Sequence, residues 1–383
     1  VVYIATATTK WVDIPGDPFQ HYIVRMEYIP GSQNILLQQL NRKQNQSRLY
    51  IADITSGSAQ VVYEETDEAW IEIYQAGNPY AIDFTNKFTW LEKDNSIIWA
   101  SEKDGWRHLY KVSLDGKPER LLTKGNYDII DVKLVDIVGG IIYFMASPDN
   151  ATQSYLYKVS IDDPGKPELL SQEELKGTHE YSFSNDGKYA FHSFSNYYTQ
   201  PGRELITIPD HRPLVEKESI LLMLDSLQEE PATEFFTIKT KDKVEMDGWM
   251  IKPKDFDPKK KYPVVFYVYT EPAGATVSDT YGVSDNQLYA GNMAEDGYIY
   301  MSLDNRGTPA PKGREWRKSI YRKIGQLNIR DQAMAAEEIL KWDFVDPERI
   351  AVWGWSGGGT ATLNLMFQYP KIYKTGIAIA AVS

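Results

Sequence analysis

Residues 350–358 read IAVWGWSGG, an apolar, strand-like run that ends in the motif Gly-x-Ser-x-Gly. Residues 360–369 suit a helix that Pro370 would stop. A serine between a strand and a helix in this motif is typical of a nucleophile elbow, where a strained turn raises the hydroxyl above the sheet. Glycine-rich turns can also carry the bare motif, so the flanking strand and helix decide the interpretation. Ser356 is therefore the candidate nucleophile.

The region around this motif alternates strands and helices. A helix is predicted over 328–342, with Asn328 as its N-cap, because apolar residues recur there at helical spacing. A hairpin is predicted from 234–238 and 248–251. Apolar runs predict further strands of one sheet at 262–270, 298–304, 349–354 and 376–382. The last two should pair in parallel through a right-handed crossover, as part of an α/β-hydrolase domain over 226–383.

The preceding part of the chain contains a repeated pattern of predicted β-strands. Similar segments centre on Leu49, Leu109, Leu156 and, more weakly, Leu205, at intervals of about 50 residues. Each is preceded by another apolar run, and polar turns come after the first three. Periods of this length with several strands each predict the blades of a β-propeller, although a plain sandwich is the alternative. We expect a partial propeller over 1–225 and a partial α/β-hydrolase over 226–383 that includes the elbow.

Composition narrows the choice of function. A chain of 383 residues is expected to form at least two domains. Its net charge of −12 argues against a nucleic-acid partner. No apolar run is long enough to cross a bilayer. The chain has no cysteine, and its five histidines show no metal-binding spacing, so neither a cofactor nor a metal is predicted. Because Val1 opens the chain without Met, we expect truncation at both ends.

Several motifs together resemble a known family. Around the elbow, the segment Ile350-Ala351-Val352-Trp353-Gly354-Trp355-Ser356 is similar to the nucleophile segment of the prolyl oligopeptidase family, dipeptidyl peptidase IV branch. Further matching segments lie at 102–110, 261–263, 268–269, 304–308, 331–332 and 344–350. The resemblance covers most of the chain and is most specific from about residue 260 onward.

The resemblance implies a propeller joined to a serine peptidase domain. Such an enzyme releases dipeptides or tripeptides from the N-termini of peptide substrates, often after proline, through an acyl-enzyme. By resemblance the protein would be an exported or periplasmic bacterial protein, and a homodimer is left open. The alternatives are an acylaminoacyl peptidase or esterase, since the elbow serves any acyl transfer, and a propeller-based binding protein whose hydrolase domain is inert.

Two further residues are candidates for the oxyanion hole. In α/β-hydrolases one donor is the backbone N–H of the residue after the nucleophile, which is Gly357 here. The resemblance places a second donor, a tyrosine hydroxyl, at Tyr269. Gly357 also stands where the branch carries a tyrosine that helps wall the proline pocket, so the preference at P1 is left open. Arg306 and Asp331 are expected to brace a loop against a helix, with contact to substrate as the alternative.

The sequence also shows whether an acidic residue and a histidine are present to complete a catalytic triad with Ser356. In this fold the triad runs Ser, then Asp or Glu, then His along the chain. No Asp, Glu or His follows Ser356, and all five histidines precede the hydrolase region. We therefore expect residues 1–383 alone not to hydrolyse peptides. The acidic pair in Tyr63-Glu64-Glu65 superficially resembles a site for a substrate's amino terminus, but a solvated strand face is the simpler interpretation.

Overall fold

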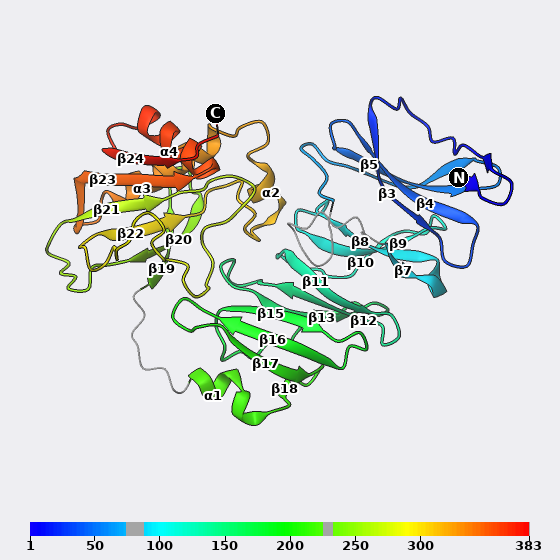
Figure 1. Cartoon of the computed structure of the whole chain (residues 1–383), viewed down its shortest axis with the longest axis horizontal. Helices are drawn as coiled ribbons and strands as arrows, with labels where there is room; N and C mark the ends of the chain where they lie inside the picture. The colour runs from blue at the N-terminus through cyan, green and yellow to red at the C-terminus, as the bar shows by residue number, and fades with distance from the viewer. Residues whose placement is uncertain (74–87, 225–232, 383) are drawn as a thin grey trace. The chain divides into compact units, whose positions relative to one another are not determined.

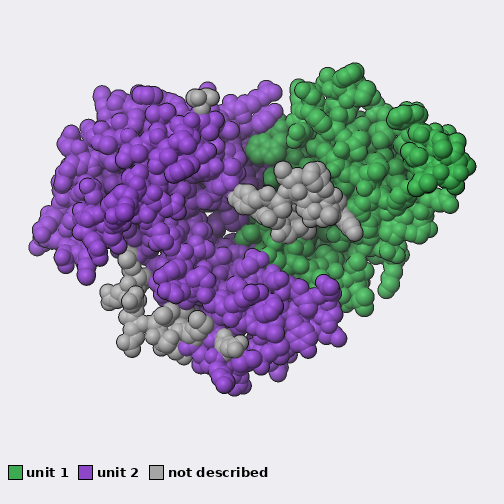
Figure 2. Space-filling view, viewed as in Figure 1, with its two compact units in different colours: residues 1–145, 157–169 green, residues 146–156, 170–383 purple. Residues whose placement is uncertain are grey.

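The structure is a computed structural model that describes residues 1–73, 88–224 and 233–382. Contacts divide the chain into two units, residues 1–145 with 157–169 and residues 146–156 with 170–383 (Figure 2). The predicted domain boundary between 225 and 226 lies outside the described residues, so it stays a prediction. No helix in the described ranges is long and apolar enough to cross a membrane.

Four antiparallel sheets of four strands each succeed one another along the chain (Figure 1). Their strands are β3 (His21–Tyr28), β4 (Asn34–Asn41), β5 (Gln46–Asp53) and β6 (Ala59–Thr66); β7 (Thr89–Leu91), β8 (Ser96–Ser101), β9 (His108–Ser113) and β10 (Arg120–Leu121); β11 (Ile129–Asp136), β12 (Ile141–Ala146), β13 (Tyr155–Ser160) and β14 (Glu168–Leu169); and β15 (Thr178–Phe183), β16 (Tyr189–Ser195), β17 (Gly202–Thr207) and β18 (Arg212–Pro213). Short elements complete this part: β1 (Val2–Tyr3), β2 (Thr8–Thr9), the 3-10 turns at Glu92–Asp94 and Glu216–Glu218, and α1 (Ile220–Leu224).

The sequence repeat corresponds to these sheets. Its leucines all fall on the third strand of a sheet: Leu49 on β5, Leu109 on β9, Leu156 on β13 and Leu205 on β17. The apolar run before each leucine forms the second strand. One four-stranded sheet for each repeat is the construction of a propeller blade, and the predicted partial propeller is confirmed.

The C-terminal region forms one mixed sheet of six strands in the order β19-β20-β22-β21-β23-β24 (Figure 1). Its elements are β19 (Thr233–Lys239), β20 (Glu245–Ile251), β21 (Tyr262–Tyr267), β22 (Ile299–Leu303), α2 (Gly313–Lys318), α3 (Leu327–Ile339), β23 (Val345–Trp355), α4 (Gly357–Gln368) and β24 (Thr375–Ile379). The hairpin of β19 and β20 is antiparallel, and β23 pairs in parallel with both β21 and β24. The predicted partial α/β-hydrolase is therefore confirmed.

Both faces of this sheet are covered. Helices α3 and α4 pack on one face, where Ile339 and Leu365 join strand residues such as Val352 in a buried core. The opposite face buries Trp249 and Trp353 against the chain between β21 and β22. A parallel sheet with apolar residues on both faces is stable only when both are packed, which explains the continuous apolar runs in the sequence.

Within the second unit, Asp279 links the chain after β21 to the fourth blade and to the segment before it. Its carboxylate accepts hydrogen bonds from Gln153 Nε2 at 2.7 Å and from the backbone N–H of Tyr197 at 2.9 Å. Its own N–H donates to the carbonyl of Thr152 at 2.7 Å. Burial raises the pKa of Asp279, and these bonds compensate in part for the cost of burying its charge.

Candidate active site

Ser356 lies between the end of β23 and the start of α4, in a backbone conformation that is unusual for its residue type. Its φ is 55° and its ψ is −118°. Such a conformation is costly for a residue with a Cβ, and it persists only where the surroundings enforce it. The Ser356 N–H donates to the carbonyl of Ile379 on β24 at 2.9 Å, and Thr360 N–H donates to the Ser356 carbonyl at 3.1 Å. This is the strained strand–turn–helix geometry of a nucleophile elbow.

The glycines around Ser356 let backbone segments approach closely. A Cβ on Gly354 would lie 2.4 Å from the carbonyl oxygen of Val268, and a Cβ on Gly358 would lie 2.1 Å from the same oxygen. A Cβ on Gly359 would lie 2.7 Å from the carbonyl oxygen of Ile379. The turn therefore closes directly onto the chain that leaves β21 and onto β24.

This close approach brings Tyr269 next to the elbow. The N–H of Val268 still pairs with the carbonyl of Trp353 at 3.0 Å, so the chain leaves β21 beside the end of β23. The Cα of Tyr269 is 3.3 Å from the place a Cβ on Gly358 would take, and the Tyr269 ring packs near Gly274. The structure thus places Ser356, Gly357 and Tyr269 together, while their catalytic roles stay a prediction.

Buried amides fix the residue after Tyr269. Thr270 is buried with a φ of 71°, again unusual for its type. Asn305 Nδ2 donates to the Thr270 carbonyl at 3.1 Å, and Asn328 Nδ2 donates to Thr270 Oγ1 at 3.0 Å. The prediction that Asn328 caps α3 is wrong: the N-cap is Gln326. Asn328 instead lies inside the first turn, where its side chain bonds to the Thr270 loop.

Ionic groups brace the neighbouring loop after β22. Arg306 donates two side-chain hydrogen bonds to the buried carboxylate of Asp331 on α3, at 2.9 and 2.7 Å, so the predicted bracing role is confirmed. Asp304 is also buried and accepts from the N–H groups of Thr276 at 2.8 Å and Val277 at 3.2 Å. Burial raises the pKa of Asp304 to about 6, although these hydrogen bonds act in the opposite direction.

Comparisons with known proteins agree with this geometry. The family model for the dipeptidyl peptidase IV N-terminal region matches residues 1–201, and the model for the prolyl oligopeptidase family matches residues 285–383. The chain belongs to the prolyl oligopeptidase family of serine peptidases, in its dipeptidyl peptidase IV branch.

Individual relatives show how much of the family's length is present. The chain is 30% identical over 357 residues to dipeptidyl peptidase 4 of Trichophyton equinum, covering 92% of this chain and 45% of that protein. Dipeptidyl peptidase 4 of Arthroderma otae is 29% identical with the same coverage. The crystal structure of Porphyromonas gingivalis dipeptidyl peptidase 4 superposes with a TM-score of 0.81 at 27% identity, covering all of this chain and 52% of that one. The chain thus spans about half the length of these relatives.

The described histidines of this prolyl oligopeptidase family member have partners close by in their own parts of the fold. His21 Nδ1 lies 3.0 Å from the carbonyl of Asp17, and His108 Nδ1 lies 2.7 Å from the Asp104 carboxylate. The other three form one cluster in the fourth blade. In the described part of the chain, no histidine is hydrogen-bonded to Ser356 Oγ.

Glu271 is a neighbour of the elbow that the sequence analysis missed. A Cβ on Gly357 would lie 2.3 to 2.7 Å from the atoms of the Glu271 carboxyl group. The carboxylate therefore occupies the space that a side chain after the nucleophile would fill. Its position two residues after Tyr269 was the available signal, but only the three-dimensional structure pairs it with Gly357.

The acidic pair on β6 has structural partners. Glu64 pairs with Arg48 Nε at 2.7 Å on the neighbouring strand. Glu65 accepts from Trp99 Nε1 at 3.0 Å and from Ser101 Oγ at 2.6 Å, so it connects the first blade to the second. These contacts favour a structural role over a site for a substrate's amino terminus, but Glu65 lies partly buried between two blades and not on the expected solvated face.

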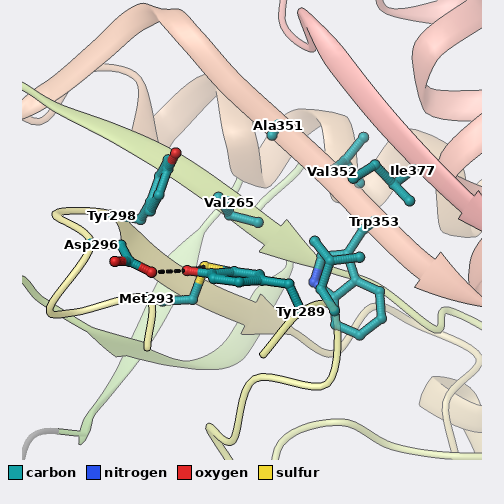
Figure 3. Close-up of a pocket in the computed structure, with 10 residues that line it drawn as sticks. Val265, Tyr289, Met293, Asp296, Tyr298, Ala351, Val352, Trp353 and Ile377 are labelled. Atoms are coloured by element: carbon teal, nitrogen blue, oxygen red, sulfur yellow. Dashed lines mark hydrogen bonds between the residues drawn. The ribbon is translucent and has the colours of Figure 1, made fainter. Parts of the chain in front are cut away.

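A separate apolar cavity of about 580 Å³ lies on the sheet face opposite α3 and α4 (Figure 3). Val265 and Trp353 line it from the sheet, and Tyr289 donates a hydrogen bond to Asp296 at 2.6 Å at its other side. Burial, together with Asp296, raises the pKa of Tyr289 to about 12. Among the described residues that line this cavity none is Ser, Cys, His or Lys.

Two glycine substitutions test the close packing of the elbow. Gly358→Ala should lower the free energy of unfolding by about 3 kcal/mol, because its Cβ meets a backbone oxygen that cannot move away. Gly357→Ala should cost under about 1 kcal/mol, because the end of the flexible Glu271 side chain can swing aside. Urea unfolding of both variants measures the difference, and equal losses would contradict the packing described.

The buried carboxyl of Asp304 predicts a pH-dependent stability. With a pKa of about 6 when folded, against 3.8 for the ordinary group, the folded state binds a proton more tightly between these values. Stability from Asp304 should therefore fall as pH rises through this window, by roughly 3 kcal/mol in total. The measurement is urea unfolding of wild type and Asp304→Asn from pH 4 to pH 7. A constant difference between the two proteins would show that the pKa of Asp304 is not raised.

Proposed function

We propose that the protein is a serine exopeptidase that releases dipeptides or tripeptides from the N-termini of peptides, often after proline. The observation that carries this proposal is the strained Ser356 at the start of α4, with Tyr269 held beside it. Relatives named dipeptidyl peptidase 4 support the same reaction class. The proposal concerns a full-length protein that contains these residues, since the chain spans about half of those relatives.

In the proposed reaction, Ser356 Oγ attacks the scissile carbonyl and forms an acyl-enzyme after the amine leaves. The oxygen of the tetrahedral intermediate would accept hydrogen bonds from the Gly357 N–H and the Tyr269 hydroxyl. The start of α4 fixes the Gly357 N–H, and close packing against Gly358 fixes the Tyr269 backbone, so little movement of either segment would accompany the reaction. The N-terminal end of α4 adds a positive dipole at the same place.

The base that activates Ser356 would come from outside these 383 residues. A serine hydroxyl is a weak nucleophile without an adjacent base, and in this fold the acid and the histidine come after the nucleophile along the chain. No Asp, Glu or His follows Ser356 here. Complementation by a downstream segment is therefore part of the proposal.

Glu271 bears on which residue is accepted at P1. By resemblance, the residue after the nucleophile helps wall the P1 pocket, and here Gly357 leaves that place to the Glu271 carboxylate.

Profiling the full-length protein on aminoacyl-prolyl and acetylated chromogenic substrates separates the proposed activity from an acylaminoacyl peptidase. Preference for the acetylated substrates would contradict the exopeptidase proposal.

The contribution of Tyr269 can be measured directly. In the full-length protein, Tyr269→Phe should lower kcat on the order of a hundredfold with KM little changed, because the lost donor acts on the transition state. Tyr267→Phe is the matched control, since its ring packs against Trp353 on the sheet. Ser356→Ala should abolish turnover.

Near-normal kcat in Tyr269→Phe would remove this tyrosine from the mechanism and leave the serine peptidase assignment in place. Turnover by Ser356→Ala at the wild-type rate would instead contradict the serine mechanism itself. The two outcomes are therefore distinguishable in one series of variants.

A further inference from the structure

The fourth blade buries a cluster of titratable side chains that the proposed reaction does not use. His179 on β15, His192 on β16 and Glu204 on β17 are each at most 3% exposed. His192 lies directly opposite Glu204 in the register of β16 and β17. His211, in the turn before β18, is 7% exposed and completes the cluster. All four belong to the second unit.

Hydrogen bonds determine where the protons of two histidines lie. A carbonyl oxygen only accepts, so His179 Nε2, at 2.8 Å from the Leu175 carbonyl, carries a proton. In a neutral ring His179 Nδ1 is then an acceptor, and His192 Nε2, 2.9 Å away, donates to it. Both rings are buried, where a charged imidazolium is costly.

The remaining nitrogen of His192 therefore presents a lone pair. His192 Nδ1 faces Glu204 Oε1 at 2.7 Å, so two acceptors point at each other. The other oxygen of Glu204 already accepts from the N–H of Ile220 at 3.2 Å. Two facing acceptors this close need a cation or a shared proton between them.

His211 supplies a third group at the same place. Among the described residues its buried Nδ1 has no hydrogen-bond partner, while its Nε2 lies 2.8 Å from the Tyr181 hydroxyl. The His211 ring lies edge-on to the His192 ring, with centroids 4.8 Å apart. One ligand atom from each of His192, Glu204 and His211 lies within 4.8 Å of the others.

We propose that His192, Glu204 and His211 bind a divalent ion of the zinc class that stabilises this blade. Two imidazole nitrogens and one carboxylate oxygen are a ligand set that zinc uses, at about 2.0–2.2 Å, with a fourth position for water. To reach this geometry, His192 Nδ1 and Glu204 Oε1, now 2.7 Å apart, would move slightly apart, and the His211 nitrogen would move toward them. Metal-binding histidines usually donate their second N–H to a fixed acceptor. Such an acceptor is present for both rings: His179 Nδ1 faces His192 Nε2, and the Tyr181 hydroxyl faces His211 Nε2.

The sequence shows no short metal motif here, because the three ligands come from two strands and a turn. The competing explanation is a proton shared between His192 and Glu204. Glu204→Gln separates the two explanations, since the amide can donate to His192 Nδ1 as a protonated carboxyl does but is a poor zinc ligand.

The test uses the purified full chain, stripped with a chelator, dialysed against Zn²⁺ and then against metal-free buffer. Elemental analysis should find one zinc ion per chain, and the melting temperature should rise by several degrees relative to the stripped protein. Glu204→Gln and His211→Asn should retain less than a tenth of that zinc and show no rise. Asn is chosen because it tolerates the positive φ of 52° at His211.

His108→Asn is the matched control, since His108 is equally buried but lies on β9 in the second blade. It should bind zinc as the wild type does. The melting temperature of each variant in chelator checks its folding, and Glu204→Gln alone decides the matter if His211→Asn does not fold. The proposal would be overturned if the wild type retained no zinc, if Zn²⁺ did not change its melting temperature, and if Glu204→Gln melted at the same temperature as the wild type. That result would establish a proton shared between His192 and Glu204.

Discussion

No side chain fits between the turn after β23 and the chain that leaves β21, and the candidate site depends on this constraint. The Val268 carbonyl oxygen lies so close to Gly354 and Gly358 that a Cβ at either position would overlap it. The same contact holds Ser356 in its strained conformation and sets Tyr269 beside it. The nucleophile and the proposed oxyanion donor are therefore positioned by backbone packing of the sheet, which is the most rigid support a site can have.

Buried polar groups extend this support outward from the elbow. Asn305 and Asn328 hold Thr270 in its unusual conformation, and Arg306 with Asp331 ties the next loop to α3. Each of these polar groups has a partner, as a low-dielectric interior requires. The result is a site whose residues come from the ends of β21, β22 and β23 and are fixed to one helix.

Local patterns in the sequence were enough to predict the architecture, whereas contacts between distant segments were not visible in them. The elbow, the parallel sheet and the blades were predictable because strand period, repeat length and the Gly-x-Ser-x-Gly spacing are local. Glu271 beside Gly357 could not be predicted, because their contact depends on how two loops close. The N-cap of α3 was misplaced because Asn328 satisfies a tertiary hydrogen bond instead. The cluster of His192, Glu204 and His211 was also missed, since its members come from two strands and a turn that only the fold brings together.

Our central claim is that Ser356, the Gly357 N–H and the Tyr269 hydroxyl form one preorganised acyl-transfer site. It is tested most directly by the crystal structure of the full-length protein after reaction with a fluorophosphonate. We predict a covalent adduct on Ser356 whose phosphonyl oxygen lies about 3 Å from both the Gly357 nitrogen and the Tyr269 hydroxyl. An adduct on a different serine, or a phosphonyl oxygen that contacts neither donor, would contradict the claim.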